Sequence, residues 1–350
     1  LASKANRWLP LKPGTDAALA MGMIRWIMEN QRYDAKYLAN ANKAAAAANK
    51  ETTWCNASWL VKLDKDGKPS TLLRAHEIGL KDKETRTDKD GKEFEFEYLV
   101  TMKDGKPLAF DPNDEKEAVV GELLVTAELK DKEGKAVAVK SSLQLLLETS
   151  QEKSIAQYAG ICDIDPEVIT EVAGEFTSHG KKACVDMHRG PAQHTNGFYN
   201  ITSLMYLNLL VGNFDWKGGM MAFSAYNTDG TKTDNQPFNF KKISPKAGKA
   251  FGLSIIRHDA KYEESTIFAD YPAKRNWWPL SSDVYEEIIP SCADAYPYSI
   301  KALFSYMGAP TYALPAGQTN IEALANLERI PLYFTTDIVI GSTTMYADYI

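Results

Sequence analysis

Cysteine is scarce in this chain and is not clustered. Its four cysteines, Cys55, Cys162, Cys184 and Cys292, show no C-x-x-C pair and no spacing typical of a metal site. The five histidines are equally dispersed. We therefore expect each cysteine to act as a small buried hydrophobic residue, and we predict no metal centre built from these residues.

Long hydrophobic runs and a strong net charge are also lacking. No run of about eighteen uncharged apolar residues occurs, which excludes a membrane-spanning helix within these residues. The formal net charge is only −6 and there is no basic stripe, so nucleic acid is not an expected partner. With 350 residues, 44% of them hydrophobic, the chain can bury one large core or two medium ones.

The chain begins without an initiator methionine and without an export signal. Leu1 opens it, and the closing residues VIGSTTMYADYI read as a strand rather than a tail. We therefore expect the sequence to be an internal fragment of a longer protein.

What the chain does have, between residues 62 and 140, is a series of turn signals. Four Asp/Glu-Gly-Lys turns separate alternating runs such as Phe94-Glu-Phe-Glu-Tyr98. The carboxylate ladder of an EF-hand loop is absent, which excludes a calcium repeat. We predict a β-rich insertion of hairpins over 62–140.

A strand-loop-helix pattern begins near the middle of the chain. Residues 182–187 are largely apolar, as a buried parallel strand would be, and a polar loop containing Gly190 and Gly197 follows. An apolar helix is expected over 200–211, with Gly212 as its left-handed C-terminal residue. A loop that opens into a helix N-terminus offers free N–H groups to an anion, so the pattern predicts a nucleotide or phosphate cradle. The alternative is an ordinary turn whose polar residues bind nothing.

Helices and strands alternate through the rest of the chain, which indicates an α/β fold with mainly parallel pairing. Residues 221–279 are polar and irregular, and we interpret them as a surface crossing or an active-site rim. We expect helices over 17–30, 34–40, 44–48, 142–149, 153–158, 167–175 and 321–326, and strands over 7–11, 302–306 and 332–334.

Three segments in the same order resemble one protein family. They are Pro13-Gly-Thr-Asp16 before an alanine-rich helix, the Gly190 to Gly197 loop with its later Leu-Val-Gly-Asn213 turn, and the strand with its Asp337 turn over 330–337, followed by residues 343–348. Together they resemble the molybdenum bis-guanine-dinucleotide oxidoreductases of the dimethyl sulfoxide reductase superfamily. The runs HRGPAQHTNGFYN and LFSYMGAPTYALPAGQTNIE look most like the tetrathionate reductase subfamily, with arsenate, polysulfide and thiosulfate reductases as alternatives.

The resemblance implies an α/β catalytic core of two Rossmann-like lobes, 1–220 with its 62–140 insertion and 221–350, the second truncated at its C-terminus. It implies molybdenum bis(molybdopterin guanine dinucleotide) as the cofactor. An iron-sulfur cluster and the metal-ligating residue are expected upstream of Leu1, so no catalytic residue is assigned and the isolated fragment should be inactive.

The resemblance also implies an activity and a setting. The expected reaction is the two-electron reduction of tetrathionate to thiosulfate in anaerobic respiration. The expected partners are the small sulfur oxyanion, an iron-sulfur electron-transfer subunit, and a quinol-oxidising membrane subunit. The expected location is the periplasm or the outer face of the membrane. Two readings of another class stay open: a non-catalytic nucleotide-binding module and a two-lobed substrate-binding protein.

Individual residues in the first lobe can be given roles by this resemblance. One carboxylate accepts both guanine donors, N1–H and the 2-amino group, so Asp16 suits guanine; helix-dipole stabilisation is the alternative. Arg189 suits phosphate, Gln193 the pterin edge and His194 a pterin heteroatom, although His194 could be a loop histidine that only packs. The predicted cofactor-binding set is Gly14, Thr15, Asp16, Arg189, Gly190, Gln193, His194, Thr195, Gly197, Asn213, Gly218, Gly219, Gly308 and Asp337.

In the second lobe the match to the family's motifs is less specific. Gly308-Ala-Pro310 corresponds to the family's Gly-x-Asn-Pro loop but lacks the asparagine, so no asparagine side-chain contact is expected there. Asp337 follows a strand and suits guanine or ribose, or else forms a turn. Cations that could line an oxyanion entry, with surface solvation as the alternative, are Lys217, Arg257 and Lys274.

Overall fold

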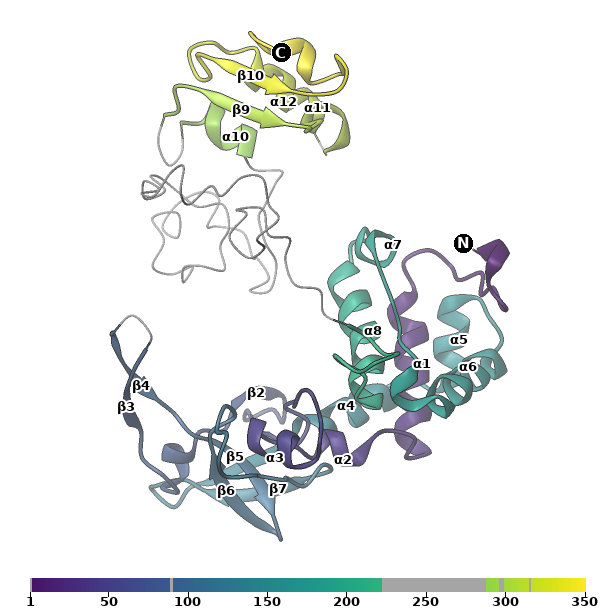
Figure 1. The fold of residues 1–350 in the computed structure, drawn as a ribbon, viewed down its shortest axis with the longest axis vertical. Coiled ribbons are helices and arrows are strands. Elements are labelled where there is room, and N and C mark those ends of the chain that lie inside the picture. The colour runs from purple at the N-terminus through teal and green to yellow at the C-terminus, as the bar shows by residue number, and fades with distance from the viewer. Residues whose placement is uncertain (1, 89–90, 222–287, 296–298, 315) are drawn as a thin grey trace, which may run out of the picture. The chain divides into compact units, whose positions relative to one another are not determined.

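The computed structural model describes residues 2–88, 91–221, 288–295, 299–314 and 316–350 (Figure 1). The chain divides into two compact units, Leu1–Ala225 and Tyr226–Ile350. The described residues combine helices with several small sheets, which confirms the mixed α/β class expected from the sequence.

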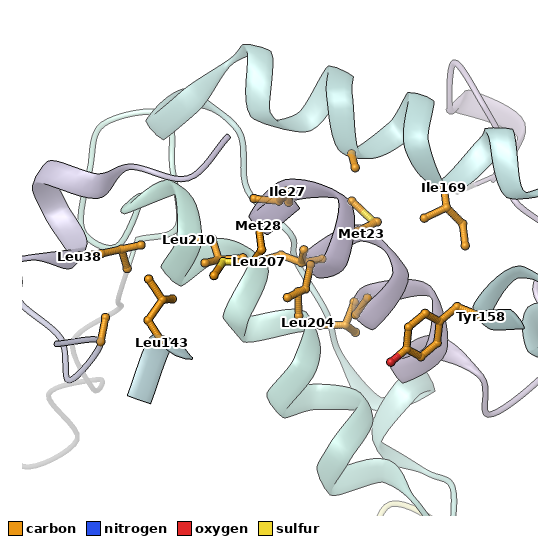
Figure 2. Close-up of a cluster of buried hydrophobic side chains, with 14 of the residues drawn as sticks. Met23, Ile27, Met28, Leu38, Leu143, Tyr158, Ile169, Leu204, Leu207 and Leu210 are labelled. Atoms are coloured by element: carbon orange, nitrogen blue, oxygen red, sulfur yellow. The ribbon is translucent and has the colours of Figure 1, made fainter. Parts of the chain in front are cut away.

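Helix α1 (Asp16–Glu29) is the centre of the N-terminal unit. It packs against α4 (Ser142–Gln151), α5 (Ile155–Cys162), α6 (Pro166–Ser178) and α8 (Gly197–Val211). Its apolar side chains recur at helical spacing and enter one core with residues of the other helices (Figure 2). That core includes Met23, Ile24, Ile27, Met28, Tyr158, Ile169, Leu204, Leu207 and Leu210.

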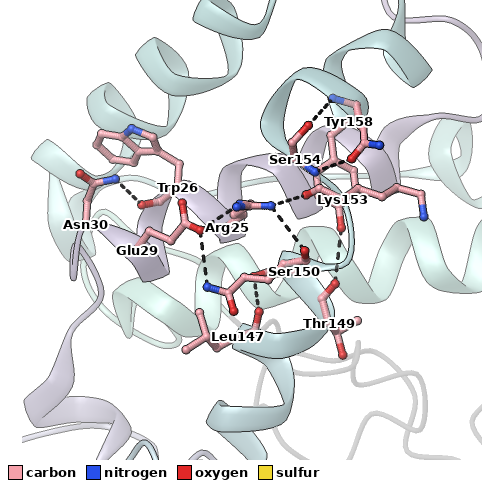
Figure 3. Close-up of polar contacts among 12 residues, drawn as sticks. Arg25, Trp26, Glu29, Asn30, Leu147, Thr149, Ser150, Lys153, Ser154 and Tyr158 are labelled. Atoms are coloured by element: carbon pink, nitrogen blue, oxygen red, sulfur yellow. Dashed lines mark hydrogen bonds and ion pairs between the residues drawn. The ribbon is translucent and has the colours of Figure 1, made fainter.

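Arg25 fixes the outer side of α1 to the connection between α4 and α5. Its guanidinium donates to the carboxylate of Glu29 at 2.9 Å and to the backbone oxygen of Lys153 at 2.8 Å (Figure 3). The connection therefore has a fixed place beside α1. The short helices α2 (Ala35–Leu38) and α3 (Lys43–Ala48) then lead into the β-rich region.

The β-rich insertion expected over residues 62–140 is present. Its main sheet has the antiparallel order β2-β1-β8-β7. In two of the turns, Asp64 and Asp131 each accept two backbone N–H groups through one carboxylate oxygen, which explains the recurring Asp of the turn signal. The strands are β1 (Leu60–Leu63), β2 (Pro69–Leu72), β7 (Thr126–Lys130) and β8 (Ala136–Ser141), with separate hairpins β3 (Glu84–Thr87)/β4 (Glu93–Phe96) and β5 (Leu99–Lys103)/β6 (Lys106–Phe110).

Two strands expected in this unit are not formed: residues 7–11 and 182–187 join no ladder. In the second segment, side chains replace a neighbouring strand. The amide of Asn208 on α8 both accepts from the backbone N–H of Val185 and donates to its oxygen, each at 2.8 Å. Asn213 donates to the backbone oxygen of Ala183 at 2.6 Å. An apolar run predicts an extended, partly buried backbone, but it does not reveal what pairs with that backbone.

The C-terminal unit contains a parallel strand pair, β9 (Leu303–Tyr306) and β10 (Tyr333–Thr336), close to both expected strands. The remaining helices are α10 (Ile288–Ala293), α11 (Pro310–Ala313) and α12 (Gly317–Leu324), the last beginning before its expected start. Residues 222–279 of the expected surface crossing lie outside the described residues. Within the described part, no helix has the length and hydropathy needed to cross a membrane.

Candidate cofactor site

Two loops predicted to bind the cofactor lie against each other in the N-terminal unit. Gly14, in the turn before α1, has a φ of +80°, and a Cβ there would lie 3.3 Å from Nδ1 of His194. The backbone oxygen of Gly14 accepts a hydrogen bond from Nδ2 of Asn196 at 3.0 Å. Residues far apart in the sequence therefore form one surface, which we call the loop site: residues 13–16 and 189–197.

A buried asparagine, Asn200, connects both parts of the loop site. Its Oδ1 accepts from the backbone N–H of Ala17 at 3.0 Å and from Nδ2 of Asn196 at 3.1 Å. Its Nδ2 donates to the backbone oxygen of Pro191 at 3.0 Å. The bond to Ala17 also satisfies one of the N–H groups that the first turn of a helix leaves without a partner.

The sequence analysis did not select Asn196 or Asn200. A signal was present, because Asn200, Leu204, Leu207 and Val211 recur at helical spacing and all four are buried in α8. A polar residue on the buried stripe of an apolar helix must find hydrogen-bond partners. That requirement predicts that the Asn200 side chain hydrogen-bonds to neighbouring backbone.

The four polar side chains of the second loop are exposed. Within the described residues, the side chains of Arg189, Gln193, His194 and Thr195 make no hydrogen bond or ion pair, although the His194 ring lies beside Gly14. The guanidinium of Arg189 is therefore an available cation, and the other three offer hydrogen-bond donors and acceptors. These groups suit a polar, anionic ligand.

The two glycines of this loop have different surroundings. A Cβ at Gly197 would lie 1.9 Å from the backbone oxygen of Ala192, so the close approach of the loop's own backbone requires glycine there. A Cβ at Gly190, in α7 (Arg189–Ala192), would meet no atom within 4 Å. Gly197 thus has a packing explanation, whereas open space adjoins Gly190.

Thr15 precedes α1 and Asp16 is its first residue, one residue before the expected start of this helix. The hydroxyl of Thr15 donates to the backbone oxygen of Lys12 at 2.6 Å instead of capping the helix. Asp16 is the first residue of α1 and is half-buried, and its carboxylate makes no hydrogen bond or ion pair among the described residues. Both of its oxygens remain available, while its charge still interacts favourably with the helix N-terminus.

Asn213, Gly218 and Gly219 lie at the other end of α8, about 22 Å along a helix of this length. Asn213 is fully buried and contacts Ala183 and Asn208, and its Oδ1 has no hydrogen-bond partner among the residues that the structure describes. A Cβ at Gly219 would lie 2.4 Å from the backbone oxygen of Asn213. These residues pack the end of α8 against the 181–183 segment, and within the described part of the chain no hydrogen bond joins them to the loop site.

In the C-terminal unit, Gly308 and Asp337 follow the carboxyl ends of two parallel strands. Tyr306 lies opposite Thr336, so both residues lie at the same edge of the β9/β10 sheet. Oδ1 of Asp337 accepts from the backbone N–H of the next residue, Ile338, at 2.7 Å. The second carboxylate oxygen of Asp337 makes no hydrogen bond among the described residues.

The cysteines do not behave uniformly. Cys162 is buried as expected and Cys55 is half-buried, but Cys184 is exposed, so its expected burial is wrong. The cause is local: Cys184 lies in the 182–187 segment, which is not inside a sheet. Burial raises the pKa of the Cys55 thiol to about 11 and also raises that of Cys162. Among the described residues, no group of three His, Cys, Asp or Glu side chains could hold a metal ion.

The cations proposed for an oxyanion entry are only partly covered by the structure. Lys217 is exposed near the end of α8, whereas Arg257 and Lys274 lie outside the described residues.

An open apolar groove of about 680 Å³ lies along α1, α4, α5 and α8, with Met21, Leu146, Phe198 and Tyr206 among its lining residues.

Comparison with known proteins gives relatives over the whole chain. No family model matches it. A selenate reductase subunit from Mesobacillus selenatarsenatis is 43% identical over 351 residues, 100% of this chain and 32% of that protein. Tetrathionate reductase subunits from Salmonella typhimurium and Archaeoglobus fulgidus are 37% and 34% identical, matching 100% and 98% of this chain and 33% and 29% of those proteins. The chain thus spans about a third of the length of these curated relatives.

A solved structure agrees with the fold. Acetylene hydratase from Pelobacter acetylenicus matches 99% of this chain and 34% of its own, with a TM-score of 0.50 and 16% sequence identity. At that identity the match shows similarity of fold alone.

Proposed function

This chain is homologous over its whole length to part of the catalytic subunits of the dimethyl sulfoxide reductase superfamily, and from that premise we propose that it forms a nucleotide-binding part of a molybdenum-dependent reductase. The observation that carries the proposal is the loop site. The Gly14 turn and the His194 loop were each assigned to the cofactor from separate parts of the sequence, and they pack against each other.

The residues of the loop site fit a molybdopterin guanine dinucleotide. Arg189 is a cation without a partner among the described residues and suits the diphosphate, because a guanidinium forms paired bonds to phosphate oxygens. Asp16 keeps both carboxylate oxygens for guanine N1–H and the 2-amino group. Gln193 and His194 would serve the pterin ring, and the open space at Gly190 admits a ligand close to backbone.

When bound, a molybdenum centre held by two pterin dithiolenes would supply two electrons to the substrate. This chain's own residues would hold the nucleotide tails and so determine where the metal lies. Asp16 would accept hydrogen bonds from the guanine and Arg189 would donate to the diphosphate of the same molecule, which would fix its direction across the loop site.

The proposed substrate is a small dianionic oxyanion of sulfur or selenium. The relative at 43% identity is named for selenate and those at 37% and 34% for tetrathionate, so selenate joins tetrathionate as a candidate. Selenate would take two electrons and two protons to give selenite and water. Tetrathionate would take two electrons into its central sulfur-sulfur bond and give two thiosulfates.

The proposed assembly contains further subunits. Each of these relatives is named as one subunit of its reductase, which supports a multi-subunit enzyme. We propose an iron-sulfur electron-transfer subunit, a quinol-oxidising membrane subunit, and a location on the outer face of the membrane. Affinity purification of the full-length protein from membranes should co-purify an iron-sulfur protein; recovery of the protein alone from the cytoplasm would contradict this arrangement.

One experiment tests both cofactor and substrate. The purified full-length protein should contain molybdenum and release guanine nucleotide on acid hydrolysis. Reduced viologen oxidation is then measured with selenate, tetrathionate, arsenate and polysulfide in parallel. Turnover of selenate or tetrathionate is the expected result. Absence of molybdenum, with stoichiometric binding of a simple nucleotide, would support the non-catalytic binding module instead.

A substitution separates the two roles of Asp16. Asp16→Ala in the full-length protein should lower its molybdenum and guanine content several-fold, because the carboxylate that accepts both guanine donors is lost. Asp165→Ala is the matched control, since Asp165 also lies at a helix start without a side-chain cap bond. Equal loading of the two variants would leave Asp16 with only its helix-dipole role.

A further inference from the structure

We infer that Asn200 is a positioning residue for the proposed cofactor, setting the separation of the Gly14 turn from the Arg189–Gly197 loop through one buried amide. The inference rests on the proposed function and assigns a role to a residue that need not touch the ligand. Its basis is that the hydrogen bonds of a single side chain reach both parts of the loop site.

The contacts define three links. Oδ1 of Asn200 accepts from Ala17 N–H, directly after the proposed guanine residue Asp16, and Nδ2 donates to the Pro191 oxygen, directly after Gly190. The third link passes through Asn196, whose Nδ2 bonds both Oδ1 of Asn200 and the Gly14 oxygen. These hydrogen bonds thereby hold the proposed guanine side and phosphate side of the loop site at a fixed separation.

Because Asn200 is buried, each of these hydrogen bonds is costly to lose. Asn200 is 0% exposed, so water cannot replace a lost partner at low free-energy cost. An ionised aspartate at this position would keep an acceptor for Ala17 but would lose the donor to the Pro191 oxygen and place a negative charge beside it. Asn200→Asp should therefore leave the start of α1 satisfied and release the Pro191 part of the loop.

The chain supplies a matched control in Asn42. This residue is also 0% exposed; its Oδ1 accepts from the backbone N–H groups of Ala45 and Val119, and its Nδ2 donates to the Glu117 oxygen. It joins a helix start to a loop in the same way, but in the β-rich region. Asn42→Asp thus imposes the same chemical change without altering the loop site.

The test compares full-length Asn200→Asp, Asn196→Ala and Asn42→Asp proteins with the wild type. Molybdenum and guanine are measured per folded protein, together with melting temperature and the electron paramagnetic resonance spectrum of the loaded fraction. We expect content to fall about tenfold in Asn200→Asp and by less in Asn196→Ala, with an altered spectrum in both. Because Asn196 is only half-buried, its variant keeps the test open if Asn200→Asp does not fold.

The outcomes are distinguishable. Asn42→Asp should lose melting temperature while keeping wild-type content and spectrum, which excludes general destabilisation as the cause. Wild-type content and spectrum in both Asn200→Asp and Asn196→Ala would overturn the inference alone. A wild-type protein without molybdenum or guanine would overturn the proposed function, and this inference with it.

Discussion

Four asparagines in and next to α8 organise the backbone around the candidate site. Asn196 and Asn200 join the Gly14 turn to the His194 loop, and Asn208 and Asn213 hold the extended segment that leads into that loop. A carboxamide carries a donor and an acceptor on one planar group, so it can satisfy both polar groups of a buried peptide without adding charge. These side chains thus supply to irregular backbone the hydrogen bonds that a neighbouring strand supplies in a sheet.

The two glycines of the second loop give a prediction at this scale. Gly197→Ala should lower the free energy of unfolding by about 1–3 kcal/mol, because its Cβ would collide with the Ala192 oxygen. Gly190→Ala should change it by less than about 1 kcal/mol, since its Cβ meets open space and its φ is not positive. Urea denaturation measures both values. Equal losses would show that the loop does not have this conformation.

Cysteine accessibility gives a second prediction at the residue scale. Cys184 should react with a maleimide in the native protein within minutes, because it is exposed. Cys162 is buried and the pKa of its thiol is raised by burial, so it should react only after unfolding. Mass spectrometry of peptides from native and urea-treated samples makes the comparison. Fast native labelling of Cys162 would contradict the packing of α5 against α1.

At the scale of elements, α8 contributes residues both to the helical core and to the loop site. One stripe of the helix packs Leu204 and Leu207 against α1, while its polar positions bond the loops at either end. The helix also ends as the sequence indicated, with Gly212 at φ +63°. Its position therefore fixes the loop site relative to the helical core.

The pairing of the 183–187 segment with α8 can be tested directly. Asn208→Leu should lower the free energy of unfolding by about 2–4 kcal/mol, because the N–H and oxygen of Val185 would both lose their partner. Hydrogen exchange of the Val185 amide should accelerate strongly in the variant, while amides in the middle of α6 stay protected. An unchanged Val185 exchange rate would mean that another group pairs with this segment.

Local pattern was enough to predict most helices, the β-rich insertion and both strands of the C-terminal unit. The helix starting at Asp16 follows from its apolar spacing, and the hairpins follow from their Asp-Gly turns. The same reasoning failed at residues 182–187, because an apolar run shows that backbone is extended without showing its partner. The contact of Gly14 with His194 could not be predicted by pattern, since it depends on how α1 packs on α8.

At the scale of the whole molecule, charge and apolar packing are unevenly distributed. Among the described residues, four of the five glutamates whose pKa is lowered lie in the β-rich insertion: Glu77, Glu84, Glu97 and Glu115. The fifth, Glu148, lies in α4 and accepts a hydrogen bond from Lys140 of β8. The helical core around α1 depends instead on buried apolar side chains. The two regions of the N-terminal unit should therefore respond differently to acid.

Acid should loosen the β-rich insertion before the helical core. A hydrogen bond from Lys83 holds the pKa of Glu97 below its ordinary range, and one from Tyr98 does the same for Glu84. A carboxyl group whose pKa is lowered by folding stabilises the fold above its unfolded pKa of about 4.3, and this contribution is lost as pH falls through the lower folded value. Hydrogen exchange at pH 7 and near pH 3.5 should show β3 to β5 losing protection while α1 keeps it. Lys83→Met should reduce this pH dependence, because the pKa of Glu97 would return toward its ordinary range; simultaneous loss of protection in α1 and the insertion would contradict the assignment.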